Sequence, residues 1–263
     1  MEIVAIIACR NEEAYLGNCL SHLTKNGIKF AILDNGSEDA TAKIAHRAEF
    51  ARSLAHYEYL PFGGSYRLQS QLARKAELAQ ELTADWVIHH DADEIMHSYN
   101  ENESLAEAIH RLSLTGADVI NFDEFVFLPL DEAYVPDLLG MQRMRRYYFF
   151  EPQPNRLMRL CKPPLAQSLV EGAGHKLIGS FTLAPETLAL RHYIFRDQEH
   201  AFNKYSVRNF DAAELARGWH FNRAHQPREK FAFPPTCLLN ELEFPESLAF
   251  DKSNPKLKHY WQW

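Results

Sequence analysis

The strongest constraint on the fold is the alternation of short apolar runs with helical repeats in the first third of the chain. Residues 3–8, 28–33 and 86–88 are apolar, β-favouring runs, and residues 54–59 form a weaker one. Apolar side chains recur at helical spacing over residues 16–23, 41–48 and 68–82, which separate these runs. This order predicts an α/β fold with a doubly wound, mostly parallel central sheet flanked by helices.

Polar residues follow three of the predicted strands directly. Asn11 comes after the first strand, Asp34-Asn35 after the second, and Asp91 and Asp93 after residues 86–88. Ligands of such sheets gather at the carboxyl ends of the strands. We therefore expect these clusters to meet at one edge of the sheet. We also expect Asn11 to cap the helix that follows, and Asn26-Gly27 to end that helix.

Three carboxylates fall within four residues at Asp91, Asp93 and Glu94. Neighbouring carboxylates resist joint ionisation, so the cluster needs an explanation. A solvated turn is one explanation. The more specific explanation is a divalent cation that neutralises the carboxylates, with a diphosphate completing its shell of oxygen ligands. A calcium loop of the EF-hand type is excluded, because Ile95 and Met96 would occupy the positions that need an oxygen ligand and a glycine.

Composition places the chain among ordinary globular proteins. The 263 residues are 46% hydrophobic and 24% charged, with a formal net charge of -7. The negative charge argues against nucleic acid as a partner, although Arg143, Arg145 and Arg146 precede a run of aromatics. A loop that closes over sugar or phosphate is the preferred interpretation of residues 131–146, which include Pro136 and Gly140.

The cysteines and the N-terminal run bear on the compartment of the protein. Cys9, Cys19, Cys161 and Cys237 have neither disulfide-scaffold nor metal-finger spacing, so reduced thiols are expected. The apolar run near the N-terminus is too short to span a membrane and is interpreted as a strand. We expect a cytoplasmic protein without a transmembrane segment, and peripheral association with a membrane is left open.

The second half of the chain is less regular. Strands are predicted over residues 117–127, 155–161 and 188–195, a glycine-containing loop over 168–176, and a helix over 198–210. Beyond Gly218, five prolines divide the chain into short pieces. We predict one main domain over residues 1–217 and a proline-rich arm over 218–263 that packs on it.

The ordered motifs resemble those of family 2 glycosyltransferases of the GT-A fold. Ile-Ile-Ala-Cys-Arg-Asn-Glu-Glu opens the chain, Leu-Asp-Asn-Gly-Ser-Glu-Asp-Ala-Thr follows the second strand, and His-His-Asp-Ala-Asp-Glu follows in the family's order. Gly174-His175, His192-Tyr193 and Lys204-Tyr205 resemble a bacterial subgroup. The resemblance implies a metal-dependent enzyme that moves a sugar from a nucleotide-diphosphate sugar to a glycan, a glycolipid or another hydroxyl acceptor.

The resemblance also implies roles for particular residues. Asp93 is the expected ligand of Mn²⁺ or Mg²⁺, Asp91 contacts the ribose or the metal through water, and His192 is the third protein ligand. His175 is the competing ligand and is otherwise assigned to the acceptor side. Arg67 is expected to reach the diphosphate, with Arg196 and Lys204 as weaker candidates. The full donor-binding set is Ala8, Arg10, Asn11, Asp34, Asn35, Arg67, Asp91, Arg196 and Lys204.

Two points depart from the family or stay unresolved. Many members carry two successive acids where this chain has Asp34-Asn35, and an amide offers a donor as well as acceptors, so uridine is not fixed as the base. An inverting enzyme also needs a carboxylate to deprotonate the acceptor hydroxyl. Glu171 is the first candidate, followed by Glu124 and Asp123, which could instead lie on the exposed side of a strand.

Two other functions remain as alternatives. The first is a metal-dependent phosphoesterase that uses His89, His90, Asp91 and Asp93. This is weaker, because successive residues of a strand point to opposite faces and both histidines cannot serve one site. The second is a nucleotide-sugar-binding protein without catalysis.

Overall fold

The structure, a computed structural model, describes residues 1–130 and 140–263. Its strands are β1 (Ile3–Cys9), β2 (Lys29–Asp34), β3 (Leu54–Tyr59), β4 (Trp86–His90), β5 (Glu94–His97), β6 (Val119–Ile120), β7 (Phe122–Phe127), β8 (Arg146–Phe150), β9 (Leu160–Cys161), β10 (Leu188–His192) and β11 (Asn240–Glu241). Its α-helices are α1 (Glu13–Lys25), α2 (Thr41–Ala45), α3 (Leu68–Glu81), α4 (Leu105–Ser113), α5 (Gly140–Arg143), α6 (Ser168–Glu171), α7 (Gln198–Phe202) and α8 (Ala212–Ala216). Short helical turns complete the set: η1 (Ala48–Phe50), η2 (Pro163–Leu165), the π-helical η3 (Asn203–Val207), η4 (Arg228–Phe231), η5 (Thr236–Leu238) and η6 (Tyr260–Gln262).

The described chain forms two compact units. The first unit comprises residues 1–61, 69–123 and 155–190, and the second comprises 62–68, 124–154 and 191–263. Strands β7 and β10 therefore each run from the first unit into the second. This grouping is no test of the predicted division at residues 217 and 218, which stays a prediction.

The central sheet belongs to the first unit. Among the described residues it has six strands in the order β3-β2-β1-β4-β9-β6. The pairs β3-β2, β2-β1 and β1-β4 are parallel, whereas β9 runs antiparallel to both β4 and β6. The predicted α/β fold with a mostly parallel central sheet is confirmed.

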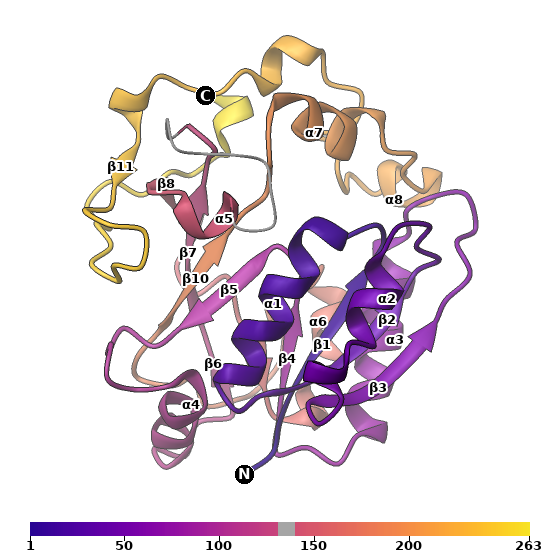
Figure 1. Cartoon of the computed structure of the whole chain (residues 1–263), viewed down its shortest axis with the longest axis vertical. Coiled ribbons are helices and arrows are strands. Elements are labelled where there is room, and N and C mark those ends of the chain that lie inside the picture. The colour runs from indigo at the N-terminus through magenta and orange to yellow at the C-terminus, as the bar shows by residue number, and fades with distance from the viewer. Residues whose placement is uncertain (131–139) are drawn as a thin grey trace. The chain divides into compact units, whose positions relative to one another are not determined.

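Helices cover both faces of this sheet because β1 and β4 are apolar on both sides. On one face Ile6 clusters with Leu78 of α3 and Leu169 of α6. On the other face α1 approaches β4, where the Cys19 Sγ lies 3.8 Å from the His90 Nδ1. Figure 1 shows α1 in front of β1 and β4. Cys9, Cys19 and Cys161 are buried free thiols, and Cys237 is an exposed one.

A second sheet has the order β11-β8-β7-β10-β5 among the described residues. Aromatic and aliphatic side chains of the second unit form a core beside it: Val126, Leu128, Tyr148, Phe150, Ile194, Phe195, Ala201, Tyr205, Phe231, Tyr260 and Trp261. Phe231, Tyr260 and Trp261, all beyond residue 218, are buried in this core. The boundary proposed for the C-terminal arm stays a prediction.

Several predicted elements differ from those observed. Asn11 is not the cap of α1, because Glu12 precedes the helix and Asn11 has a left-handed backbone with φ 56°. In the region 155–161 only β9 forms a strand, and 168–171 is a helix where a loop was predicted. The helix predicted over 198–210 ends early as α7 and continues as η3. Pro136 and the rest of 131–139 lie outside the described residues.

Candidate active site

The turns that follow β1 and β2 bind each other. The Arg10 guanidinium donates to the carbonyls of Asn35 and Gly36, and it forms a 3.0 Å ion pair with Glu38. The Asn11 side chain accepts a 2.8 Å hydrogen bond from the Glu38 amide. Because Cys9 of β1 lies in register with Asp34 of β2, the two strands end together. The predicted meeting of these two polar clusters is therefore present, with Ala8 at the same strand end.

Asp34 is buried at the end of β2, and both its oxygens are used. Oδ1 accepts from the Ser37 amide at 2.8 Å, and Oδ2 accepts from the Tyr57 hydroxyl at 2.8 Å. Burial, followed by the hydrogen bond to Asp34, raises the pKa of Tyr57 above its ordinary value, so this hydroxyl stays a donor. Asp34 therefore shapes the turn in this structure.

The Asn35 amide is held by neighbours from two other segments. Its Oδ1 accepts from the Gln71 Nε2 at 3.2 Å, and its Nδ2 donates to the Leu60 carbonyl at 3.3 Å. The side chain is only partly buried. These two contacts fix the directions in which the side-chain oxygen and nitrogen of Asn35 point.

The acidic turn, residues 91–94, connects β4 to β5 and contains two buried cation contacts. Arg159 Nη1 lies 3.0 Å from Asp91 Oδ2 and 2.5 Å from Glu94 Oε1. Lys75 Nζ donates to the His90 carbonyl at 2.8 Å and lies 3.5 Å from Asp91 Oδ1. Thus the repulsion between Asp91 and Glu94 is relieved by protein cations. Asp93, in the same turn, is 6% exposed.

Burial governs the protonation of the basic groups around this turn. It lowers the pKa of the Lys75 ammonium, against the opposing effect of Asp91. It also lowers the pKa of His90 to about 3 and that of His89 well below its ordinary value. Both imidazoles are therefore neutral near pH 7.

The two histidines point to opposite faces of β4, as predicted. His90 meets Cys19 of α1, whereas His89 lines a small pocket together with Leu72 and Lys75 of α3. Gly174 lies against the His89 ring, since a Cβ built there would be 2.9 Å from Nε2. One ion cannot be held by both histidines, which removes the basis for the phosphoesterase.

Glu171, the last residue of α6, and His175, in the loop that follows, are also in the first unit. Both side chains are exposed. The His175 carbonyl accepts a 2.7 Å hydrogen bond from the Met158 amide. Gly174 has φ 77°, which favours glycine, so the Gly-His motif has a backbone explanation.

Asp123 and Glu124 are both buried, which excludes the alternative that they lie on the exposed side of a strand. They are successive residues of β7 and therefore point to opposite faces. Asp123 Oδ2 accepts from the hydroxyls of Tyr99 and Thr187 at 2.7 and 2.8 Å. Glu124 Oε1 lies 2.6 Å from the His192 Nδ1 in the second unit.

The predicted phosphate-binding cations also belong to the second unit. Arg67 is exposed and lies 3.3 Å from Asp211, while Lys204 donates to the Ile194 carbonyl at 3.1 Å. The Arg196 amide donates to the His200 ring at 3.2 Å. Asp93 belongs to the first unit and His192 to the second.

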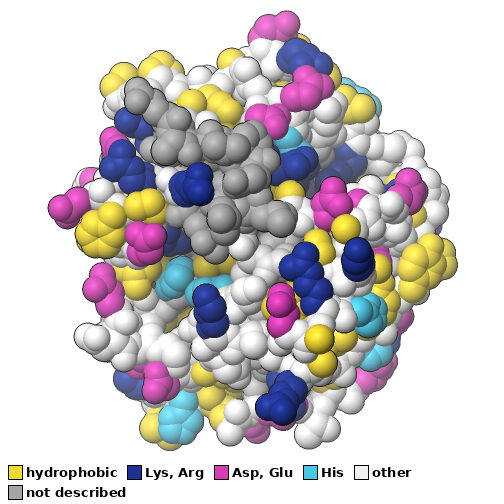
Figure 2. Space-filling model, in the orientation of Figure 1, with side chains coloured by type: hydrophobic (Ala, Val, Ile, Leu, Met, Phe, Trp, Pro, Cys, Tyr) yellow, Lys and Arg dark blue, Asp and Glu magenta, His cyan; other side chains and the backbone are white. Residues whose placement is uncertain are grey.

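The basic group at 143–146 is engaged with β11. Arg145 and Arg146 form ion pairs with Glu241 at 2.6 and 3.2 Å, while Arg143 ends α5 and is exposed. On the face shown in Figure 2, basic and acidic side chains of the described residues are interspersed. These contacts give Arg145 and Arg146 a role within the fold.

The residues present fit a divalent cation only in part. No group of three or more His, Cys, Asp and Glu side chains that could hold a metal ion occurs within residues 1–130 and 140–263. A Mg²⁺ ion, however, is commonly bound by one or two carboxylates together with substrate phosphates. Asp93, together with Asp91 in the same turn, fits an ion whose remaining ligands include the oxygens of a bound diphosphate.

Sequence reasoning missed three residues of this region: Lys75, Arg159 and Tyr57. Arg159 lies 65 residues from Glu94, and no local spacing signals that contact. Lys75 and Tyr57 sit in a helix and a strand that were predicted from apolar residues alone. A basic residue within an apolar helical face was the one available signal for Lys75.

The chain matches the profile of a known family over residues 4–159, a region that contains the turns described above and the acidic turn. That family is described as Glycosyl transferase family 2. The protein belongs to this family.

Other comparisons identify individual relatives. The lipopolysaccharide core biosynthesis glycosyltransferase LpsC of Rhizobium meliloti (strain 1021) is 29% identical over 122 residues. That match covers 46% of this chain and 41% of LpsC, so it spans less than half of either protein.

Among solved structures, S. aureus TarS in complex with UDP-GlcNAc is similar, with a TM-score of 0.48 and 15% identity over 76% of this chain and 60% of that one. The mannosyltransferase PcManGT from Pyrobaculum calidifontis, in complex with GDP-Man and Mn²⁺, has a TM-score of 0.45 and 13% identity over 84% and 62%. Among the described residues of the present chain, no helix is long and apolar enough to cross a membrane.

Proposed function

We propose that this glycosyltransferase moves a sugar from a nucleotide-diphosphate sugar to a hydroxyl of a glycan or lipid-linked acceptor, with Mn²⁺ or Mg²⁺ as cofactor. One observation carries the proposal. The turns after β1, β2 and β4, three adjacent parallel strands, present Arg10-Asn11, Asn35 and the acidic turn at the carboxyl end of one sheet. Nucleotides bind at this edge in open α/β sheets. The likeness to LpsC favours a lipid-linked saccharide as the acceptor.

In this proposal the residues of the first unit bind the nucleotide and the cation. Asp93 holds the cation, with Asp91 as its neighbour toward the ribose, and Asn35 contacts the base. When bound, the cation would stabilise the charge that develops on the departing diphosphate. His192 is proposed as a further ligand, and Arg67, Arg196 and Lys204 are proposed as phosphate contacts.

For the base that takes the proton of the acceptor hydroxyl, we propose Glu171. It is exposed at the end of α6, and His175, which we propose to lie on the acceptor side, follows four residues later. The two competing carboxylates are buried and already bonded, Asp123 to two hydroxyls and Glu124 to His192. Glu171→Gln should abolish transfer while nucleoside diphosphate binding is retained.

A thermal-shift screen of nucleoside diphosphates, with and without Mn²⁺, tests the donor and the cation together. A ligand at a hundred times its dissociation constant adds about 2.7 kcal/mol of apparent stability. Uridine and guanosine diphosphates should be compared first, because the Asn35 amide can donate to and accept from either base. No stabilisation by any diphosphate would contradict the proposal.

Donor hydrolysis without added acceptor then separates catalysis from binding alone. A transferase loses some donor to water, whereas an inert binder leaves the donor intact. Release of phosphate from generic monoesters would instead favour the phosphoesterase. Cytoplasmic location and peripheral association with a membrane are further expectations, which fractionation of cells that express the protein would test.

A further inference from the structure

We propose that Arg159 is a positioning residue that sets the geometry of the acidic turn. The inference rests on the proposed function, because it concerns the turn that is proposed to hold the cation. Arg159 itself is not assigned to any ligand. Its role is to fix Asp91 and Glu94, the two residues that flank Asp93 in the turn.

The first observation is the contact set of the guanidinium. A single nitrogen, Nη1, lies 3.0 Å from Asp91 Oδ2 and 2.5 and 2.6 Å from the two oxygens of Glu94. The exposed fractions of the Arg159 and Glu94 side chains are 4% and 1%. Charge-assisted hydrogen bonds shielded from water are strong and directional. This arginine therefore joins the first and last residues of the turn.

The second observation is that the main chain of Arg159 is fixed to the strand that precedes the turn. Its carbonyl accepts a 2.7 Å hydrogen bond from the His89 amide. The next residues, Leu160 and Cys161, pair with Ile88 and Val87 as strand β9. The backbone of Arg159 is thus in register with β4, and its side chain reaches the turn that β4 leads into.

The third observation is that the turn closes on itself around these contacts. The Asp91 amide donates to Glu94 Oε2 at 3.1 Å, and the Glu94 amide donates to the Asp91 carbonyl at 3.2 Å. Lys75 holds the other oxygen of Asp91 from α3. Asp91 is consequently held from two sides, and Asp93 is carried by a turn whose two ends are fixed.

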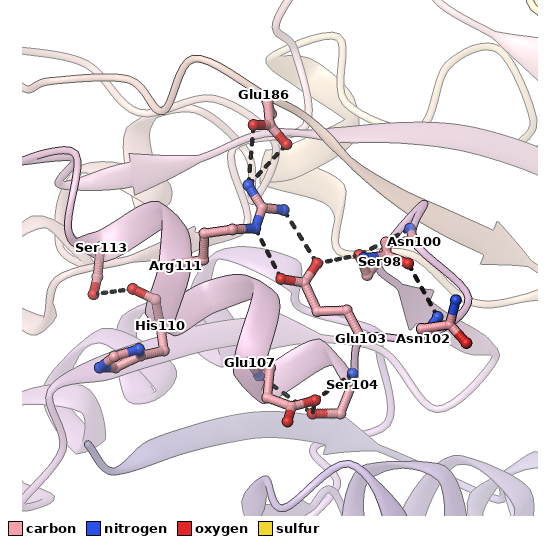
Figure 3. A network of polar contacts seen from close by, with 10 residues as sticks. All are labelled: Ser98, Asn100, Asn102, Glu103, Ser104, Glu107, His110, Arg111, Ser113 and Glu186. Atoms are coloured by element: carbon pink, nitrogen blue, oxygen red, sulfur yellow. Dashed lines mark hydrogen bonds and ion pairs between the residues drawn. The ribbon is translucent and has the colours of Figure 1, made fainter.

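The test compares Arg159→Lys, which keeps the charge and loses the planar guanidinium, with a matched control. Arg111→Lys is the control, because Arg111 also joins two carboxylates in the first unit, Glu103 and Glu186, but is far more exposed (Figure 3). Glu94→Gln is the second test variant, since it leaves Arg159 intact. Thermal midpoints within about 4 °C of the wild type qualify a variant for comparison.

Two measurements are made on each variant. Hydrogen exchange of the peptide that contains residues 91–94 reports the turn without any ligand. The Mn²⁺ concentration for half-maximal stabilisation by a nucleoside diphosphate reports the cation. For Arg159→Lys and Glu94→Gln we expect faster exchange in that peptide and about a tenfold higher Mn²⁺ requirement, as for other partners of metal ligands. Arg111→Lys should match the wild type in both measurements.

Each other outcome contradicts the inference in a recognisable way. Unchanged exchange in the turn means that Arg159 does not hold it, whatever the activity. Faster exchange with an unchanged Mn²⁺ requirement, or loss of the fold in both test variants, reduces Arg159 to a structural role. If the wild type itself shows no Mn²⁺ response, the proposed function fails, and the hydrogen exchange still decides whether Arg159 fixes the turn.

Discussion

The His192 Nδ1 lies 2.6 Å from the Glu124 Oε1, so a buried carboxylate of β7 fixes the ring of a histidine at the end of β10. Metal-binding histidines commonly donate one ring N–H to a carboxylate, which orients the other nitrogen and makes it more basic. The contact thus selects Nε2 as the atom of His192 that would bind a cation. It also makes Glu124 an orienting residue, which weakens its candidacy as the base.

We predict that His192→Ala raises the Mn²⁺ concentration needed for activity, whereas His175→Ala leaves it nearly unchanged. Glu124→Gln should raise it by about 10- to 100-fold through loss of the orienting contact. Initial rates of donor hydrolysis across a Mn²⁺ titration provide the measurement. If His175→Ala alone changes the Mn²⁺ requirement, the ligand is His175. If neither alanine variant does, Asp91 and Asp93 are the only protein ligands among these candidates.

Asp93→Ala should abolish turnover and metal-dependent nucleotide binding while the protein stays folded. Its removal takes one negative charge from a turn that already contains Asp91 and Glu94, so repulsion in the turn decreases. Circular dichroism and thermal-shift titration with Mn²⁺ and diphosphate measure the fold and the binding separately. Wild-type turnover in this variant would remove the metal hypothesis.

Arg67→Ala should weaken binding of a nucleoside diphosphate much more than binding of the nucleoside. A hydrogen bond to a charged group contributes about 1.5–3 kcal/mol, which is roughly tenfold or more in affinity. The exposed ion pair with Asp211 contributes little stability, so the fold should be unaffected. Calorimetric titration with both ligands measures the difference, and equal losses would place Arg67 away from the phosphates.

Gly174→Ala should destabilise the protein more than Gly116→Ala does. Both glycines have left-handed backbones, with φ 77° and 80°, and share that cost. Only at Gly174 would the added Cβ meet other atoms, the His89 Nε2 at 2.9 Å and the Leu72 Cδ2 at 3.0 Å. Overpacking of this kind costs about 1–3 kcal/mol. Denaturant unfolding measures the stability of both variants. Equal losses of stability would contradict the steric clash expected at Gly174.

Acidification below about pH 6.5 should reduce stability partly through His220. Burial, aided by Arg223, lowers the pKa of this histidine in the folded state, while its hydrogen bond to Glu214 opposes the shift. As the pH falls toward the folded-state pKa, the unfolded chain takes up a proton that the folded chain does not, and the free energy of unfolding decreases. Below the folded-state pKa that loss is complete.

The variant that tests this is His220→Asn, since asparagine tolerates the left-handed backbone of φ 61°. It should flatten the dependence of the free energy of unfolding on pH below about pH 6.5, by up to about 1.4 kcal/mol per pH unit. Urea titrations at several pH values measure the slope. An unchanged slope would assign the acid sensitivity to other groups.

The strands β1, β2 and β4 were predictable because each is a continuous apolar run, and burial on both faces of a parallel sheet demands such a run. The proximity of Arg10 and Asn11 to residues 35–38 was predictable from the parallel arrangement of the strands alone. Asn11 was wrongly expected to cap α1, since the same residue type also tolerates a left-handed turn and its side chain bonds Glu38 instead.

The neutralisation of the acidic turn could not be predicted from spacing. The sequence places three acids together, and a metal ion was the natural counter-charge to invoke. The structure supplies two protein cations: Arg159, 65 residues beyond Glu94, and Lys75, from the helix before β4. The burial of Asp123 and Glu124 was likewise hidden, because their partners Thr187 and His192 lie more than 60 residues away.

The position of β9 has a practical consequence for anyone who wishes to produce a shorter version of this protein. The family match ends at Arg159, one residue before β9, which lies between β4 and β6. A fragment cut at that boundary would leave the hydrogen-bonding edge of β4 uncovered at Val87 and Ile88. Exposed edges of this kind recruit other chains. Such a fragment is expected to aggregate during expression, however completely it contains the family's recognised motifs.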